Sequence, residues 1–192
     1  MSNPPVDIDL DAVEAASARG HALDFPRTRL TDAIDAFVGA FHVVANWVWA
    51  VLILLIVLNV ALRYAIGTNF IALEELQWHL YALGFMIGLA YAVRADAHVR
   101  VDVIAERFSL TTRAVIEALG IAFFILPLCW IMLTYGLPFV ERAWTINEVS
   151  AAPGGLPHRW AIKSVILVAF ALLGLAALSR LIRVLAWLAG RR

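Results

Sequence analysis

Two pairs of polar side chains are the first candidates for chemistry in this chain of 192 residues. Glu74 and Glu75 are adjacent carboxylates, a combination that serves acid–base reactions or cation binding. His42 and His79 are potential axial ligands of a haem. All four lie in or beside long apolar stretches of a chain that is 62% hydrophobic. What these groups do therefore depends on where the apolar stretches place them.

Four apolar stretches carry no charge near their middle, and the first contains 27 uncharged residues, enough for a helix about 40 Å long. A hydrocarbon core of roughly 30 Å is crossed by such a helix with tilt to spare. We predict an all-α integral membrane protein with transmembrane helices over residues 36–62, 76–93, 114–140 and 161–188. An acidic tail (1–35) precedes them and a short basic end (189–192) follows.

The distribution of basic residues predicts the orientation of these helices. With both termini in the cytoplasm, eleven Lys and Arg face the inner side and four the outer side. Acidic residues barely enter this rule, so the tail is no objection. The fourth stretch is short, and we expect Lys163 and Arg180 to lengthen it by extending their stems toward the headgroups. Trp78, Trp144 and Trp160 then fall at outer helix ends, where such rings collect.

The predicted depths bear on each candidate group. His42 lies about 9 Å from the inner end of its helix and His79 about 5 Å from the outer end of the next, too far apart in depth for one haem. Interhelical hydrogen bonding or placement at the membrane interface is the expected role of these histidines. Glu74 and Glu75 begin a helix at the outer surface, where carboxylates favourably meet the helix dipole. Arg63 extends outward or binds a lipid phosphate.

Three further groups lie inside the apolar stretches. Trp47, Trp49 and Trp130 are deep, and we expect them to pack against other helices. The middle of every stretch lacks the ionisable residues that mark an ion or substrate path. No nucleophile arrangement, nucleotide-binding glycine pattern or metal-ligand cluster is visible in the sequence, so we expect neither enzymatic activity nor a cofactor nor a nucleic-acid partner.

The connector after the second helix alternates polar and apolar residues. Val101, Ile104, Ala105 and Phe108 recur at helical spacing among charges, which predicts a short amphipathic helix on the inner membrane surface. We take as candidate partner or lipid contacts the polar and tryptophan residues at the membrane surfaces: Arg63, Glu74, Glu75, Trp78, Asp96, His98, Arg100, Asp102, Trp144 and Trp160.

The chain resembles the small membrane subunit, of DctQ type, of tripartite ATP-independent periplasmic (TRAP) transporters. Three segments carry the resemblance: Val-Leu-Asn-Val-Ala-Leu-Arg-Tyr (57–64), Leu-Glu-Glu-Leu-Gln-Trp (73–78) with the apolar span after it, and Ala-Asp-Ala-His-Val-Arg-Val-Asp-Val-Ile (95–104). The last is the most specific, because such alternation is unusual directly beside a membrane span. The similarity extends over about residues 35–187.

The resemblance implies a multi-pass protein of the bacterial inner membrane. It implies two partners: a large multi-span subunit that holds the substrate and sodium sites, and a periplasmic binding protein that delivers substrate, often an organic acid. The small subunit then acts as a scaffold in sodium-driven symport and has no substrate site of its own. Two alternatives remain: a self-sufficient small four-helix exporter, although its membrane carboxylate is missing, and a haem or quinone membrane anchor.

Overall fold

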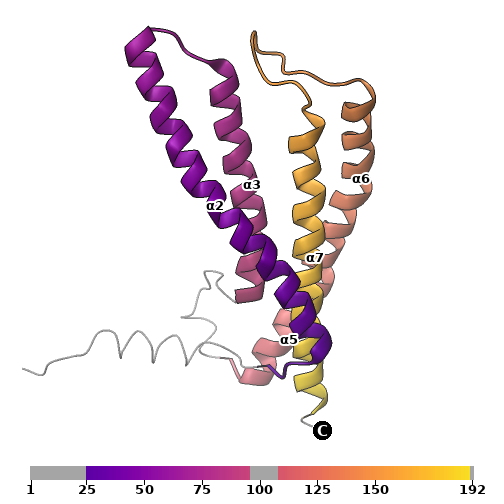
Figure 1. Cartoon of the computed structure of the whole chain (residues 1–192). Helices are drawn as coiled ribbons and strands as arrows, with labels where there is room; N and C mark the ends of the chain where they lie inside the picture. The colour runs from indigo at the N-terminus through magenta and orange to yellow at the C-terminus, as the bar shows by residue number, and fades with distance from the viewer. Residues whose placement is uncertain (1–24, 96–107, 191–192) are drawn as a thin grey trace, which may run out of the picture.

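The computed structural model describes residues 25–95 and 108–190, and these form a bundle of long helices (Figure 1). In chain order they are α2 (Arg29–Ile66), α3 (Ile71–Ala95), α5 (Leu110–Gly120), the π-helical turn η1 (Ile121–Ile125), α6 (Leu126–Thr145) and α7 (Trp160–Ala189). Because α5, η1 and α6 run on as one rod, four helices are long and apolar enough to cross a membrane. The predicted fold class and its four spans are confirmed.

The first helix is longer than the predicted span because its caps, a threonine pair and a glycine, lie beyond both ends of that span. Thr28 and Thr31 form a reciprocal capping box, in which each backbone N–H donates to the other's hydroxyl. At the far end Gly67 adopts φ 73° and its N–H donates to the Arg63 carbonyl at 2.9 Å. The helix therefore has 38 residues, about 57 Å, and extends beyond a hydrocarbon core at both ends.

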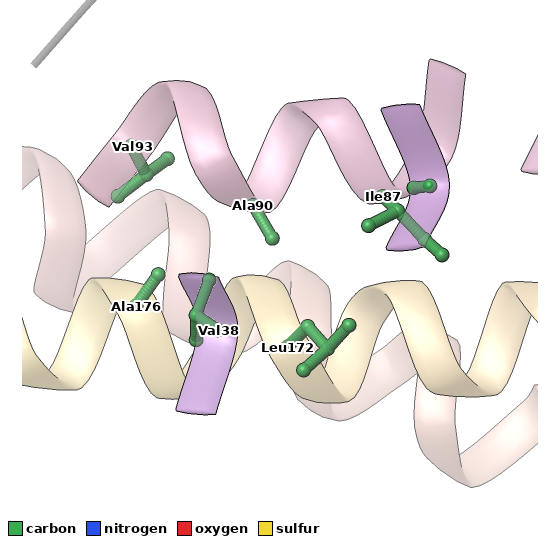
Figure 2. Close-up of a cluster of buried hydrophobic side chains, with 7 residues drawn as sticks. Val38, Ile87, Ala90, Val93, Leu172 and Ala176 are labelled. Atoms are coloured by element: carbon green, nitrogen blue, oxygen red, sulfur yellow. The ribbon is translucent and has the colours of Figure 1, made fainter. Parts of the chain in front are cut away.

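The buried side of α2 follows a strict seven-residue repeat. Thr31, Val38, Ala45, Leu52 and Asn59 are its buried residues. A repeat of seven keeps one seam against its neighbours when helices wrap around each other with a slight left-handed supercoil. In the inner half of the bundle this seam meets α3 and α7, and the three helices enclose a cluster that includes Val38, Ile87, Ala90, Val93, Leu172 and Ala176 (Figure 2).

Glycines bring the middles of the helices together. A Cβ added to Gly84 of α3 would lie 2.9 Å from Cε2 of Trp49, so the indole lies directly on the glycine. Trp49 and Gly84 are the midpoints of the predicted spans 36–62 and 76–93. Gly174 of α7 likewise faces Cys129 of α6, with its would-be Cβ 3.6 Å from the cysteine Cβ. We take the level of these contacts as the bilayer midplane.

Helix α7 is the central helix, since it contacts α2, α3, α5, η1 and α6. The pair α2 and α3 diverges from the pair α6 and α7 toward the outer end, whereas the inner ends converge (Figure 1). Both the start of α2 and the end of α7 lie at this converged end. We call it the inner end, following the orientation predicted from the basic residues. The positions of the helices do not test that orientation.

The third membrane rod accommodates a proline through its π-helical turn. Pro127 has no N–H to give to a carbonyl in the preceding turn. The chain widens just before it, where the Leu126 N–H donates to the carbonyl of Ile121, five residues back. Such single π turns are a common source of helix bending. Pro138, the second proline of this rod, lies inside α6, which continues to Thr145.

Candidate functional site

At the outer end, Glu75 fastens the long connection between α6 and α7 (residues 146–159) to α3. One carboxylate oxygen accepts a hydrogen bond from the Ser150 hydroxyl, and the other accepts the Leu156 N–H at 2.6 Å. Gly155 lies so close that a Cβ there would come within 2.9 Å of Glu75 Oε2. The Glu75 carboxylate therefore holds the middle of the outer connection through Ser150 and Leu156, which lie 75 and 81 residues later in the chain.

The two ends of this outer connection are fixed by Glu148. Its N–H donates to the Ala143 carbonyl at 3.0 Å, and its carbonyl accepts the Arg159 N–H, also at 3.0 Å. Its carboxylate forms an ion pair with Lys163 and lies 3.8 Å from Nε of Arg159. We predicted that Lys163 extends toward the headgroups. In the structure its ammonium instead pairs with Glu148 of the outer connection. Its ammonium also lies 4.0 Å from the ring centroid of Phe139.

The tryptophans at the two ends of the outer connection meet. The rings of Trp144 and Trp160 have centroids 4.5 Å apart and an interplanar angle of 72°. An edge-to-face pair of this kind adds to the burial of the rings. Together with the contacts of Glu75 and Glu148, it makes the outer connection a fixed surface element.

Glu74 and Glu75 do not act as a carboxylate pair, because their side chains bind different partners. Glu74 accepts a hydrogen bond from Nδ2 of Asn69 at 2.7 Å and so closes the short turn between α2 and α3. Glu75 binds the outer connection instead. Within the part of the chain that the structure describes, no three His, Cys, Asp or Glu residues gather into a metal site.

Trp78 and Arg63 lie apart from this outer connection. Trp78 is 75% exposed and lines a shallow recess of about 240 Å³ between α2 and α3, together with Leu52, Ile56, Gln77 and Tyr81. Arg63 is exposed, with its Cζ 5.7 Å from the centroid of the Tyr64 ring. Both remain candidates for lipid or partner contact. The predicted inner-surface helix and its candidates Asp96, His98, Arg100 and Asp102 lie outside the described residues.

At the inner end, α2 and α7 are joined by an ion pair that sequence reasoning missed. Asp35 accepts hydrogen bonds from Nη2 of Arg183 and, at 2.8 Å, from the Ser179 hydroxyl. Arg183 is only 8% exposed. Ser179 and Arg183 continue the spacing of the buried Leu172 and Ala176, so they lie on the core face of α7. That spacing is the available signal, whereas the orientation argument treats Arg183 only as one of the basic residues on the inner side.

Arg180 forms a second ion pair at this end. It is 9% exposed, donates to Glu117 of α5, and lies over the Phe25 ring with its Cζ 4.7 Å from the centroid. The expectation that Arg180 extends to the headgroups is wrong, because the side chain turns inward to a carboxylate on a neighbouring helix. The two ion pairs connect α2, α5 and α7 where the bundle converges.

The deeper aromatic residues differ in their surroundings. His42 stacks on Tyr91 of α3 with centroids 3.6 Å apart, so its contact with the neighbouring helix is a ring stack and not a hydrogen bond. Trp49 packs on Gly84 and meets Tyr81 edge to face at 5.8 Å. Trp47 and Trp130, by contrast, are 72% and 73% exposed. For these two, the expected packing against other helices is wrong within this chain.

These features define a class: a multi-pass α-helical membrane protein whose charged side chains gather near the two ends of an apolar bundle. Residues 52–186, more than two thirds of the chain, match the family described as "Tripartite ATP-independent periplasmic transporters, DctQ component". The chain belongs to this family and is a small permease subunit of a TRAP transporter. Neither a curated protein nor a solved structure matches the chain.

Proposed function

We propose that this subunit is the static scaffold of a sodium-driven uptake system for organic acids in the bacterial inner membrane. Its partners are a large permease subunit, which holds the substrate and sodium sites, and a periplasmic binding protein. Family membership supports the transporter component. We infer from the packing of the bundle that this chain is the scaffold and that the large subunit carries out transport.

The observation that carries the proposal is the apolar packing at the bilayer midplane. There Trp49 lies on Gly84 and Cys129 faces Gly174, with a cluster of Ala, Val, Leu and Ile side chains just inside this level. Ion and substrate paths through a bundle usually contain ionisable groups at this depth. The described charges instead lie near the ends of the bundle, and several of them form ion pairs there, as Asp35 does with Arg183. Such a construction suits a rigid membrane body and not a moving transport path.

The outer connection (residues 146–159) supports docking of the binding protein. Three independent contacts fix it: Glu75 at its middle, Glu148 near its start, and the Trp144–Trp160 pair at its ends. A preorganised surface loses little conformational freedom on binding. We therefore infer that this connection forms part of the platform on which the loaded binding protein settles.

The proposal is tested by reconstitution into liposomes. The large subunit is inserted alone or together with this chain, the binding protein is added outside with labelled organic acid, and uptake is followed with and without an inward sodium gradient. We expect uptake only with both membrane subunits and the gradient. The affinity of the isolated binding protein for its substrate serves as the control and should not change. Full uptake by the large subunit alone would refute the scaffold role.

A further inference from the structure

The surface of α2 opposite its buried seam has the features of a helix-docking face. Val43, Trp47, Ala50 and Leu54 follow one another at spacings of four, three and four residues, and all are exposed. Asn46 is exposed beside them. Alternating spacings of three and four are those of a helix that packs along another helix. We call these five residues the outward face of α2.

Asn46 lies close to the middle of the membrane. Trp49, which rests on Gly84 at the midplane, is three residues further along the helix, or about 4.5 Å. The inner end of the bundle, marked by Asp35, is eleven residues away in the other direction, about 16 Å along the axis. The short side chain of Asn46 therefore cannot reach a headgroup region from its depth.

The amide of Asn46 lacks a hydrogen-bond partner within residues 25–95 and 108–190. A primary amide has two donor hydrogens and one acceptor oxygen, and lipid tails offer none of the matching groups. Leaving such a group in hydrocarbon is costly, whereas asparagine side chains in membranes typically bond across helix interfaces. The occupant of this face must therefore supply polar groups at the midplane, which a lipid does not.

Trp47 gives an independent indication. Its indole is 72% exposed and lies two residues from Trp49, far from the headgroup level where tryptophan N–H groups find water. Ala50, one turn beyond Asn46, leaves room for another backbone to come close. The large Trp47 ring and the small Ala50 side chain thus form a ridge and a groove into which a second helix can pack.

We propose that the outward face of α2 is the surface on which a transmembrane helix of the large permease subunit packs, with the Asn46 amide hydrogen-bonded across the interface. This inference rests on the proposed function, which supplies a membrane partner of that kind. The proposal assigns one face of the bundle to the interface: the outward face of α2, between Val43 and Leu54, is covered by protein and not by lipid.

Photo-crosslinking in the assembled complex tests this assignment. A benzoylphenylalanine replaces Trp47, and in a separate variant it replaces Trp130 of α6, an equally exposed tryptophan one residue from Cys129 at the midplane. We expect the Trp47 variant to form an adduct with the large subunit on irradiation in membranes. An adduct with a second copy of this chain, or with lipid alone while the large subunit copurifies, would overturn the proposal. An adduct of the Trp130 variant with the large subunit, while the Trp47 variant gives none, would also overturn it.

A second measurement isolates the amide. Asn46→Leu keeps the size of the side chain and removes its hydrogen bonds, so we expect about tenfold weaker association with the large subunit in detergent. The thermal stability of the isolated chain should not change, because the described structure gives Asn46 no bond within the chain. Thr134→Val, at an exposed position of α6, is the matched control and should leave association unchanged. Unaltered affinity of Asn46→Leu would contradict the proposal.

Failure of the inference is distinguishable from failure of the proposed function. If the large subunit does not copurify with the unmodified chain at all, the proposed function is refuted and the inference falls with it. If the two subunits copurify and crosslink only through other faces, the proposed function stands and the assignment of the α2 face is wrong.

Discussion

Breaking the ion pair between Asp35 and Arg183 should strongly destabilise the bundle. Asp35→Ala removes the acceptor of both the Arg183 guanidinium and the Ser179 hydroxyl. Arg183 is 8% exposed, and its Nε already lacks an acceptor among the described residues. Removing one partner of a buried pair costs about 3–5 kcal/mol of unfolding free energy. Because this pair lies at the inner end, where the freed guanidinium can turn toward water, we expect the lower value, about 3 kcal/mol.

The same reasoning predicts recovery in a double variant. Asp35→Leu combined with Arg183→Leu leaves no uncompensated charge, and apolar replacements of buried pairs are often neutral or stabilising. We expect the double variant to unfold within about 1 kcal/mol of the native chain. Asp32→Asn is the comparison: Asp32 is exposed one turn earlier and attracts Arg183 only as a nearby charge, without the hydrogen bond that Asp35 makes, so we expect a loss below about 1 kcal/mol.

Equilibrium unfolding of the purified chain in mixed dodecylmaltoside and SDS micelles, followed by far-UV circular dichroism, measures these differences. Two results would refute the reasoning. One is an Asp35→Ala variant as stable as Asp32→Asn. The other is a double variant whose loss equals the sum of the losses of Asp35→Leu and Arg183→Leu measured singly, since the pair would then contribute no coupling.

Two further predictions concern the packing at the midplane and the outer connection. Gly84→Ala should lower the unfolding free energy by about 1–3 kcal/mol in the same assay, because its Cβ would meet an indole at 2.9 Å; Gly88→Ala, with open space around the added Cβ, should not. Glu75→Gln should speed hydrogen exchange at the Leu156 amide, which loses its carboxylate acceptor, whereas Glu74→Gln should leave that amide protected. Equal exchange in both variants would show that the carboxylate of Glu75 does not hold the connection.

The four membrane spans were predictable because hydrocarbon thickness sets a minimum length for an uncharged helix. The extent of α2 was not. Asp32 and Asp35 suggested a polar tail, yet both belong to the helix, because Thr28 caps it and Arg183 pairs with Asp35. An acidic residue at a helix start carries the same sequence signal whether it faces water or a buried guanidinium.

The contacts of the candidate site were less predictable than the spans. Adjacent glutamates at a helix start gave no indication that Glu74 closes a local turn while Glu75 binds Ser150 and Leu156 far along the chain. That difference depends on the path of the outer connection, which follows from packing and not from local pattern. The membrane part of α2 is apolar on all its faces, so the sequence did not indicate which face is buried within the chain.

The placement of polar contacts explains how helices of such uniform apolarity reach one arrangement. Lipid tails are as apolar as leucine, so burial of apolar surface does not select a partner face within the membrane. Selection comes from close packing at Gly84, from the Gln77 amide donating to the Leu55 carbonyl at 3.3 Å, and from the ion pairs at the inner end. The same logic applies outside the bundle. A midplane amide on an exposed face selects a partner as Gln77 does, and the outward position of Asn46 is why we look for that partner in the large subunit.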